Sequence, residues 1–470
     1  MTGDRPRKQV HLAAHFPGVN STTVWSDPAS GSQTDFSSFV HLARTAERGK
    51  FDFFFLAEGL RLREHRGRIF DLDVVGRPDS LTVLSALAAV TDRIGLAATV
   101  NTTFNEPYEL ARQFASLDHL SAGRAAWNAV TSPDAFTGEN FRRGGFLPRS
   151  ERYRRAEELI LAARRLWDSW DDDAVVADAG RGVFVADDDA GRFEHTGDHF
   201  AIAGVFDVPR SPQGHPVQIQ AGDSDEGREL AAAYADVIFS RHSGSTAGRR
   251  FYADVKGRLG RYGRRPDELK IIPAATVVLG DSEDEAHERA AHIHRQQVSP
   301  QGAIAFLEQV WGRDLSACDP DGPLPDVEPD VDGSISITRG RVRHDRDPLA
   351  VAAAWRRRAE EEQLSIRQLV IEVTARTAFV GTPAQVADKI DSRVQADAAD
   401  GYILVPHLTP HGLDEFVDTV VPLLQERGTF RADYSGPTLR DHLGLARPPV
   451  AGHPVAETEA VSVYSEGSSG

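Results

Sequence analysis

Polar side chains follow most of the short apolar segments of this sequence, at the point where each segment ends. The apolar segment 10–16 contains His15 near its end, and the segment 51–57 is followed directly by Glu58. Such groups can hydrogen-bond an organic ligand and exchange protons with it. Loops are polar in any protein, so the recurrence at segment after segment matters more than any single residue. The other members of this set are Asn101, Thr102, Thr103, Asn128, Thr131, Ser132, Asp223, Ser224, Ser240, Arg241, His242 and His407.

The segment 221–227 (AGDSDEG) joins a predicted strand to a predicted helix and has two readings. Glycine permits close backbone approach, and the free N–H groups of a helix start can hold an anion. Alternatively, this is an ordinary helix start, with Ser224 as the N-cap and the following acids facing the positive end of the helix dipole. The three acids of the segment repel a phosphate, so phosphate binding here requires backbone donors and a cation from elsewhere.

Eight apolar segments alternate with amphipathic stretches of helical period, and these segments must position the polar residues. Continuous apolar runs are typical of parallel strands buried on both faces. Eight βα units predict an α/β fold, a (β/α)8 TIM barrel whose site lies at the C-terminal ends of the strands. A doubly wound open sheet is the rival architecture. The eight predicted strands cover 10–16, 51–57, 94–100, 125–130, 217–221, 237–239, 271–279 and 402–405.

Three segments interrupt this alternation. We expect a single barrel domain over residues 1–447, with insertions near 171–216 and 312–366 in loops at the C-terminal face, where they would shape the substrate pocket. The part of the second insertion at 314–333 is rich in Pro, Asp and Gly and is predicted to be loop. The Pro-, Ser- and Gly-rich tail, 448–470, is expected to be disordered.

Composition and missing motifs exclude several classes of protein. The 470 residues carry 53 Lys and Arg against 70 Asp and Glu, a formal net charge of −17, which disfavours a nucleic-acid partner. The single cysteine, Cys318, cannot form an intramolecular disulfide, which fits a cytoplasmic location, and we expect no signal peptide or membrane partner. The sequence has no G-x-G-x-x-G, no H-E-x-x-H and no G-x-S-x-G. We therefore predict no dinucleotide site and no metal.

Several motifs, taken in order, resemble the bacterial-luciferase-like flavin monooxygenases. The similarity covers roughly residues 8–447 and is strongest to the branch with nitrilotriacetate, dibenzothiophene-sulfone and long-chain alkane monooxygenases. It is specific for the family and not for a substrate. The motifs that carry it are IGLAATVNTTFNEPY (94–108), SAGR (121–124), WNAVTS (127–132), ERY (151–153), QAGDSDEGRE (220–229), VGTP (380–383) and DGY (400–402).

The resemblance implies an FMN-dependent monooxygenase. Such an enzyme takes reduced FMN from a separate flavin reductase and uses O2, through a flavin C4a-peroxide, to oxygenate a small organic substrate. Sulfur- and nitrogen-containing compounds are candidate substrates, and the sequence does not reveal which one is used. The absence of a dinucleotide motif is consistent with a separate reductase. We further expect a homo-oligomer, a dimer or tetramer.

The resemblance also implies roles for individual residues. Ser224 and the preceding loop with Asp223 would hold the FMN phosphate together with the Tyr153 hydroxyl, whereas Thr103 and Asn128 would face the isoalloxazine ring. Glu58 stands where this branch usually has Asp, and Arg149 stands where relatives often have His. Arg149 could pair with the phosphate or be a solvated loop residue. His15 is the candidate catalytic residue in contact with peroxide or substrate; a buried structural histidine is the other interpretation.

Two other functions remain open. A member of the same superfamily could use the deazaflavin F420 for hydride transfer instead of activating oxygen. A barrel of this kind could also bind flavin without catalysis, although the presence of Thr103, Asn128, Tyr153 and Ser224 together argues against that.

Overall fold

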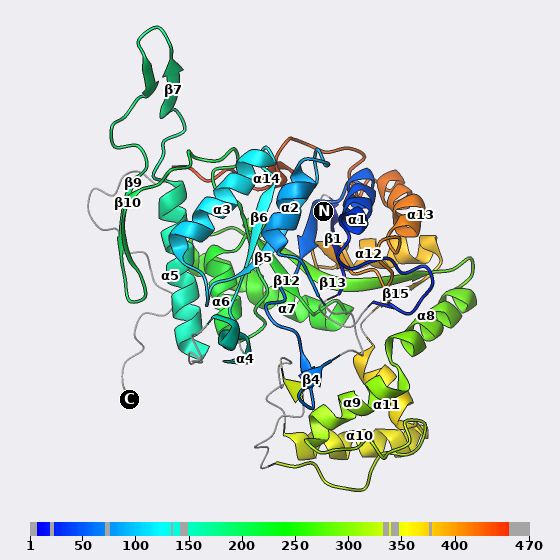
Figure 1. Cartoon of the computed structure of the whole chain (residues 1–470). Helices are drawn as coiled ribbons and strands as arrows, with labels where there is room; N and C mark the ends of the chain where they lie inside the picture. Colours follow the sequence, from blue (N-terminus) through cyan, green and yellow to red (C-terminus); the bar gives the residue numbers. More distant parts are fainter. Residues whose placement is uncertain are drawn as a thin grey trace.

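Eight parallel strands close into a barrel at the centre of the molecule (Figure 1). The computed structural model describes residues 7–18, 23–70, 76–132, 135–141, 149–331, 338–339, 347–375 and 378–450. Each barrel strand pairs with the next along the chain, and the pairing of β12 with β13 and of β16 with β1 closes the sheet. The predicted (β/α)8 barrel is confirmed, and the open sheet is excluded. The barrel strands are β1 (His11–His15), β2 (Phe53–Leu56), β5 (Gly95–Asn101), β6 (Ala125–Val130), β11 (Val217–Gln220), β12 (Val237–Ser240), β13 (Lys270–Leu279) and β16 (Gly401–Leu404).

Alternate residues of each strand point into the barrel, because successive side chains of a strand lie on opposite faces. Ala13, Phe55, Ala97 and Ala126 belong to one buried apolar cluster drawn from strands all around the barrel, which is its interior. The neighbouring strand residues belong instead to the larger cluster shared with the helices. Thr99 lies two residues beyond Ala97 and therefore also faces inward. The interior thus becomes polar toward the C-terminal end of the barrel.

Helices pack around the outside of the barrel (Figure 1). The short helix α14 (Leu439–Leu443) instead closes the amino-terminal end, since its two leucines join the interior cluster. The surrounding helices are α1 (Phe36–Arg48), α2 (Ser80–Ala88), α3 (Pro107–Leu120), α5 (Arg149–Trp167), α6 (Asp225–Tyr234), α7 (Ser245–Arg258), α8 (Glu283–Gln297), α12 (Pro383–Gln395) and α13 (Asp414–Glu426). Short turns of helix are α4 (Ala135–Gly138), η1 (Glu139–Phe141), η2 (Leu259–Tyr262) and η3 (Pro266–Glu268).

The first insertion follows α5 and contains the hairpins β7 (Val175–Asp178) with β8 (Val183–Val185) and β9 (Arg192–Thr196) with β10 (Ala201–Val205). It joins the barrel at the amino-terminal ends of the strands: Gln213 Nε2 donates to the carbonyl of Ala125, the first residue of β6, at 2.7 Å. The expectation that 171–216 inserts at the C-terminal face is wrong for this segment. A segment that follows a helix and precedes a strand begins at the amino-terminal end of the barrel. A segment that follows a strand begins at the C-terminal end.

The second insertion follows β13 and forms a helical subdomain with its own apolar cluster. Its helices are α9 (Pro300–Trp311), α10 (Pro348–Glu362) and α11 (Ile366–Thr374), below the barrel in Figure 1. A small sheet links it to the segment after β2, because β14 (Thr338–Arg339) pairs with β3 (Glu64–His65), which pairs with β4 (Arg68–Ile69). The chain then forms β15 (Ala378–Gly381), which extends the sheet beside the second half of β13. This insertion lies on the C-terminal side of the strands, as predicted.

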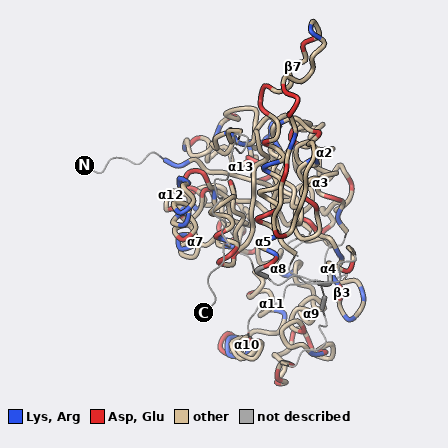
Figure 2. The backbone as a smooth tube through the Cα atoms, turned by 90° about the vertical axis from the view of Figure 1, so that its left-hand side faces the viewer, with Lys and Arg blue, Asp and Glu red and all other residues tan. Residues whose placement is uncertain are grey.

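Acidic and basic residues are interspersed over the barrel, and acidic residues gather at the base of β7 (Figure 2). Among the described residues, none of the helices is long and apolar enough to span a membrane. The part of the predicted disordered tail from 451 to 470 lies outside the described residues.

Candidate functional site

The C-terminal ends of β1 and β2 bring His15 and Glu58 to the same end of the barrel. His15 is buried, and its ring centroid lies 5.4 Å from that of Phe55 on the neighbouring strand. Phe55 in turn stacks on Phe239 of β12 at 5.6 Å, so this end of the interior is lined by aromatic rings. His15 thus combines a buried aromatic environment with a position at the end of a barrel strand where active sites of this fold lie.

Asn128 is held by a residue that sequence reasoning did not single out. Its Nδ2 donates to Thr99 Oγ1 at 3.0 Å, and both side chains are buried on paired positions of β5 and β6. Among the described residues, nothing hydrogen-bonds the buried Oδ1 of Asn128. A buried acceptor without a partner is costly, so this atom fits a ligand N–H or O–H. Thr99 could have been found from the two-residue period, because it faces inward with Ala97.

Asn101, Thr103 and Ser132 fix the turns that follow β5 and β6. Asn101 Oδ1 accepts from the backbone N–H of Thr103 at 2.6 Å, and Thr103 Oγ1 accepts from the backbone N–H of Ser132 at 3.1 Å. All three side chains are buried. We call Thr99, Asn101, Thr103 and Asn128 the inner polar face.

Glu58 has an unusual protonation state for a carboxyl group. Burial, reinforced by the charge of Asp79, raises the pKa of Glu58 to about 8, against the opposing effect of a hydrogen bond from the Asn101 backbone. The carboxyl is therefore largely protonated at pH 7 and can donate a hydrogen bond or a proton. A neutral acid beside the inner polar face suits acid–base work on a bound organic ligand.

Tyr153 and Ser224 come together at the start of α6, as predicted from the resemblance. Tyr153 Oη lies 3.2 Å from Ser224 Oγ, and Ser224 Oγ also accepts from the Gly227 backbone N–H at 3.2 Å. Ser224 is thus the N-cap of α6, and the interpretation of this segment as an ordinary helix start is confirmed. The Tyr153 hydroxyl adds a second hydrogen-bonding group, which an N-cap does not require.

The glycines of this segment are required by close packing. A Cβ on Gly222 would lie 2.9 Å from the Gly227 Cα, and one on Gly227 would lie 2.8 Å from the Gly222 Cα. Gly222 N–H is held by Gln220 Oε1 at 2.6 Å. We call Tyr153, Gly222, Ser224 and Gly227 the α6 cradle; its hydroxyls, backbone N–H groups and helix terminus suit an anion.

Two of the three acids around the cradle, Asp223 and Asp225, are paired with basic side chains. Asp223 Oδ1 is 3.1 Å from Arg228 Nη2 and 2.8 Å from His242 Nε2. Asp225 pairs with Arg258 at 2.6 Å. These pairs offset two of the three acids that would repel a phosphate in this segment. The backbone of Arg149 begins α5, and its side chain lies outside the described residues.

Arg77 is a further residue that sequence reasoning missed. Its guanidinium donates to the carbonyls of Ala57 and Pro17, both at 2.9 Å, and so joins the segments after β1 and β2. Burial lowers its pKa to about 10. No periodicity marks a loop arginine of this kind, so the sequence offered no signal for it.

Comparison with known proteins identifies what the chain is similar to. The family model described as luciferase-like monooxygenase matches residues 18–401. Nitrilotriacetate monooxygenase component A of Aminobacter aminovorans is 42% identical over 427 residues, covering 88% of this chain and 91% of that one. Dibenzothiophene-sulfone monooxygenase of Rhodococcus erythropolis (strain XP) is 37% identical, with 95% and 99% covered. The crystal structure of a long-chain alkane monooxygenase matches with a TM-score of 0.76 at 30% identity, over 93% of this chain and 96% of that one.

Proposed function

The chain belongs to the luciferase-like monooxygenase family, and from this premise we propose that it is the oxygenase component of a two-component, FMN-dependent system. In this proposal a separate flavin reductase supplies reduced FMN, and the enzyme uses O2 to oxygenate a small organic molecule that contains sulfur or nitrogen. The names of two relatives support this substrate class, since nitrilotriacetate contains nitrogen and dibenzothiophene sulfone contains sulfur. That the chain is a monooxygenase follows from its family.

The observation that carries the FMN assignment is the pair of hydroxyls on Tyr153 and Ser224, 3.2 Å apart at the start of α6. Both can donate to a phosphate, and the backbone N–H groups of the helix start add further donors. The Gly222–Gly227 contact leaves no Cβ between the two backbones, so the cradle stays narrow. The pairing of Asp223 and Asp225 with cations reduces the repulsion that a phosphate dianion would meet.

The inner polar face is proposed to bind the flavin ring. The Asn128 Oδ1, which has no partner among the described residues, accepts a hydrogen bond from the ring, and Thr103 lies against it. Glu58 holds a proton near neutral pH, and His15 contacts the substrate at the aromatic end of the interior. Reduced FMN, when bound, supplies the activation of O2, and the chain orients it and excludes water.

Arg149 is proposed to contact the FMN phosphate, with Asp223 lining the same site. The Arg149→Ala variant is then expected to weaken FMN binding more than riboflavin binding, because riboflavin has no phosphate. Arg149→Lys should restore only part of the affinity, since the bidentate guanidinium is lost. Equal losses for both ligands would assign Arg149 to the ring or to the fold.

The test of the proposal combines anaerobic titration with turnover. Reduced FMN should bind to the purified chain, and oxygenation of a panel of sulfur- and nitrogen-containing organics should require reduced FMN and O2. With NADH and FMN alone the purified protein should turn over slowly, and an added flavin reductase should restore the rate. Efficient turnover without the reductase would contradict the two-component assignment. Preferential binding and reduction of F420 would replace the oxygenase by a hydride-transfer enzyme.

A homo-oligomeric assembly and a cytoplasmic location belong to the same proposal. The oligomeric state can be measured by light scattering during size-exclusion chromatography, where a mass of 51.3 kDa marks the single chain. The reductase is expected to deliver reduced flavin and to have no permanent place in this assembly.

A further inference from the structure

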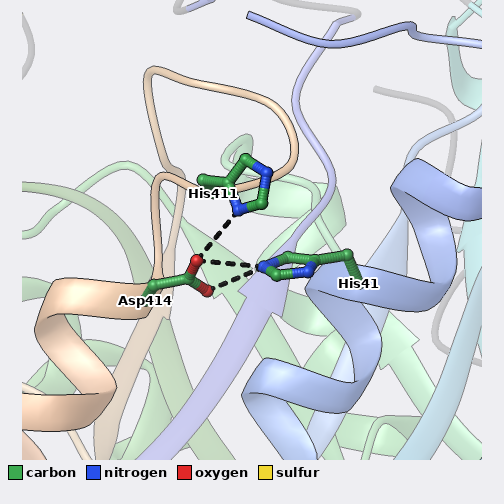
Figure 3. Close-up of side chains that lie close together, drawn as sticks. All are labelled: His41, His411 and Asp414. Carbon is green, nitrogen blue, oxygen red and sulfur yellow. Dashed lines mark hydrogen bonds and ion pairs between the residues drawn. The ribbon is translucent and has the colours of Figure 1, made fainter. Parts of the chain in front are cut away.

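Two histidines and an aspartate meet at the end of the seam between α1 and α13, outside the site described above (Figure 3). His41 is on α1, Asp414 is the first residue of α13, and His411 is in the loop between β16 and α13. His41 Nε2 lies 3.0 Å from both carboxylate oxygens of Asp414, and His411 Nδ1 lies 3.0 Å from Oδ2. All the potential ligand atoms lie within 4.8 Å of one another. Residues 370 positions apart thus present two imidazole nitrogens and a carboxylate to one point.

The histidine–carboxylate separations are close to those of a tetrahedral metal site, and the two imidazole nitrogens lie within 4.8 Å of each other. With metal–nitrogen and metal–oxygen bonds of about 2.0–2.1 Å, ligand atoms at the corners of a tetrahedron lie about 3.3 Å apart. The 3.0 Å separations need only a small adjustment to reach that value. The His411 side chain is 58% exposed, so a fourth position is open to water. Two imidazoles and one carboxylate are the donor set of zinc and neighbouring divalent transition metals and are too rich in nitrogen for Mg²⁺ or Ca²⁺.

The three ligands are held in place by the surrounding structure. Thr45, one turn along α1 from His41, donates its hydroxyl to Asp414 Oδ1 at 2.9 Å. The loop that carries His411 is fixed by backbone bonds, from Val24 N–H to the carbonyl of His407 at 2.7 Å and from Asp414 N–H to that of His411 at 3.1 Å. A hydroxyl on a ligating carboxylate is the outer-shell contact that orients metal ligands. A preorganised set costs less ordering entropy on binding.

We propose that His41, His411 and Asp414 bind a divalent transition metal of the zinc class, with water as the remaining ligand. In the metal-free chain the histidines donate N–H groups to Asp414. Binding moves the proton of each imidazole to its other ring nitrogen by exchange with solvent, so that His41 Nε2 and His411 Nδ1 each offer the metal a lone pair and no imidazolate is formed. The ion would then fasten the loop after β16 to α1 and α13, on the rim of the barrel. This site is independent of the proposed flavin chemistry.

The test uses the full chain with Cys318→Ser, which removes the one thiol, and Zn²⁺ or Co²⁺ as the probe. Calorimetry with Zn²⁺ should give one tight site, and Co²⁺ should give the visible absorption of a four-coordinate nitrogen–oxygen site. His411→Ala and Asp414→Asn should each weaken binding by more than about tenfold, and Thr45→Ala by about tenfold. The matched control is His287→Ala, which removes an exposed histidine of α8 and should leave the affinity unchanged.

Each outcome decides the proposal. His411 is exposed, so His411→Ala should retain the far-ultraviolet circular dichroism and the melting temperature of a folded chain; loss of the tight site in that variant supports the assignment. Zn²⁺ should also raise the melting temperature of the parent and not that of His411→Ala. Equal Zn²⁺ affinity in the parent, His411→Ala and Asp414→Asn would overturn it. Absence of a tight site in the parent would do the same, and the cluster would then be a hydrogen-bond network only.

Discussion

The α6 cradle and the inner polar face lie at the same end of the barrel and treat their polar groups differently. In the cradle, the Tyr153 and Ser224 hydroxyls contact each other, and the flanking acids Asp223 and Asp225 are paired with cations. At the inner polar face, the protein bonds one end of the Asn128 amide and leaves the buried Oδ1 without a partner among the described residues. One region has its hydroxyls and two flanking acids already bonded, and the other offers a buried acceptor that has no partner among the described residues.

This difference assigns different tasks to the two regions. A cradle that is already bonded and neutralised is preorganised, so its groups need little rearrangement to bind an anion. A buried acceptor without a partner discriminates among ligands, because one that lacks a matching donor leaves the acceptor unpaired. The cradle should therefore recognise the phosphate of FMN, and the inner polar face should recognise the ring. Riboflavin, which has the ring and no phosphate, separates the two.

The largest expected effect comes from the two hydroxyls of the cradle. Tyr153→Phe and Ser224→Ala should each weaken binding of reduced FMN by about 10- to 150-fold, because each removes a hydrogen bond to a charged group worth about 1.5–3 kcal/mol. Riboflavin affinity should change little. Anaerobic titration of both ligands measures this, and the double variant should lose less than the sum because the hydroxyls share a contact. Unchanged FMN affinity in both single variants would place the phosphate elsewhere.

A slightly smaller loss is expected from filling the glycine contact of the cradle. In Gly222→Ala the new Cβ would lie 2.9 Å from the Gly227 backbone, so the loop must shift away from its anion-binding arrangement. Restoring that arrangement when FMN binds should cost about 1–3 kcal/mol, or about 5- to 150-fold in FMN affinity. The matched control is Gly257→Ala on α7, where the added Cβ meets nothing within 4 Å among the described residues apart from its chain neighbours and the nearby backbone of its own helix. Equal FMN affinities for the two variants would show that the cradle tolerates the shift.

The next prediction concerns the proton on Glu58. Its pKa of about 8 in the folded chain exceeds the ordinary 4.5, so the folded state binds more protons than the unfolded state between these pH values. The free energy of unfolding should therefore fall as pH rises from 5 to 8, by at most about 1.4 kcal/mol per pH unit from this group. Glu58→Gln should lose this part of the pH dependence and should be more stable than the parent at pH 9.

Denaturant unfolding at pH 5, 7 and 9 measures the effect. Glu360→Gln on the exposed face of α10 is the control, and its pH dependence should match that of the parent. If Glu58→Gln and the parent change in parallel over this range, the carboxyl ionises normally. Glu58 would then be charged at pH 7 and could not act as a hydrogen-bond donor to the ligand.

The sequence predicted the barrel well because parallel strands buried on both faces leave continuous apolar runs. The run 51–57 contains β2 with only its ends trimmed, and Tyr153 and Ser224 meet as the motifs implied. The end of the barrel at which the first insertion lies was predicted wrongly, because composition does not indicate at which end a segment begins. Arg77 and the pairing of Arg228 with Asp223 were missed because they depend on side-chain approach in three dimensions.

The smallest expected effect is at Asn128, and it provides the sharpest contrast with the cradle. Asn128→Ala removes one neutral hydrogen bond to the ring, worth about 0.5–1.5 kcal/mol, so affinity should fall about 2- to 13-fold. The loss should be equal for FMN and riboflavin, because the ring is common to both. The apo chain should remain folded, since the variant also removes a buried acceptor that has no described partner. A loss confined to FMN would move Asn128 to the phosphate end, and the division of tasks between the two regions would have to be reversed.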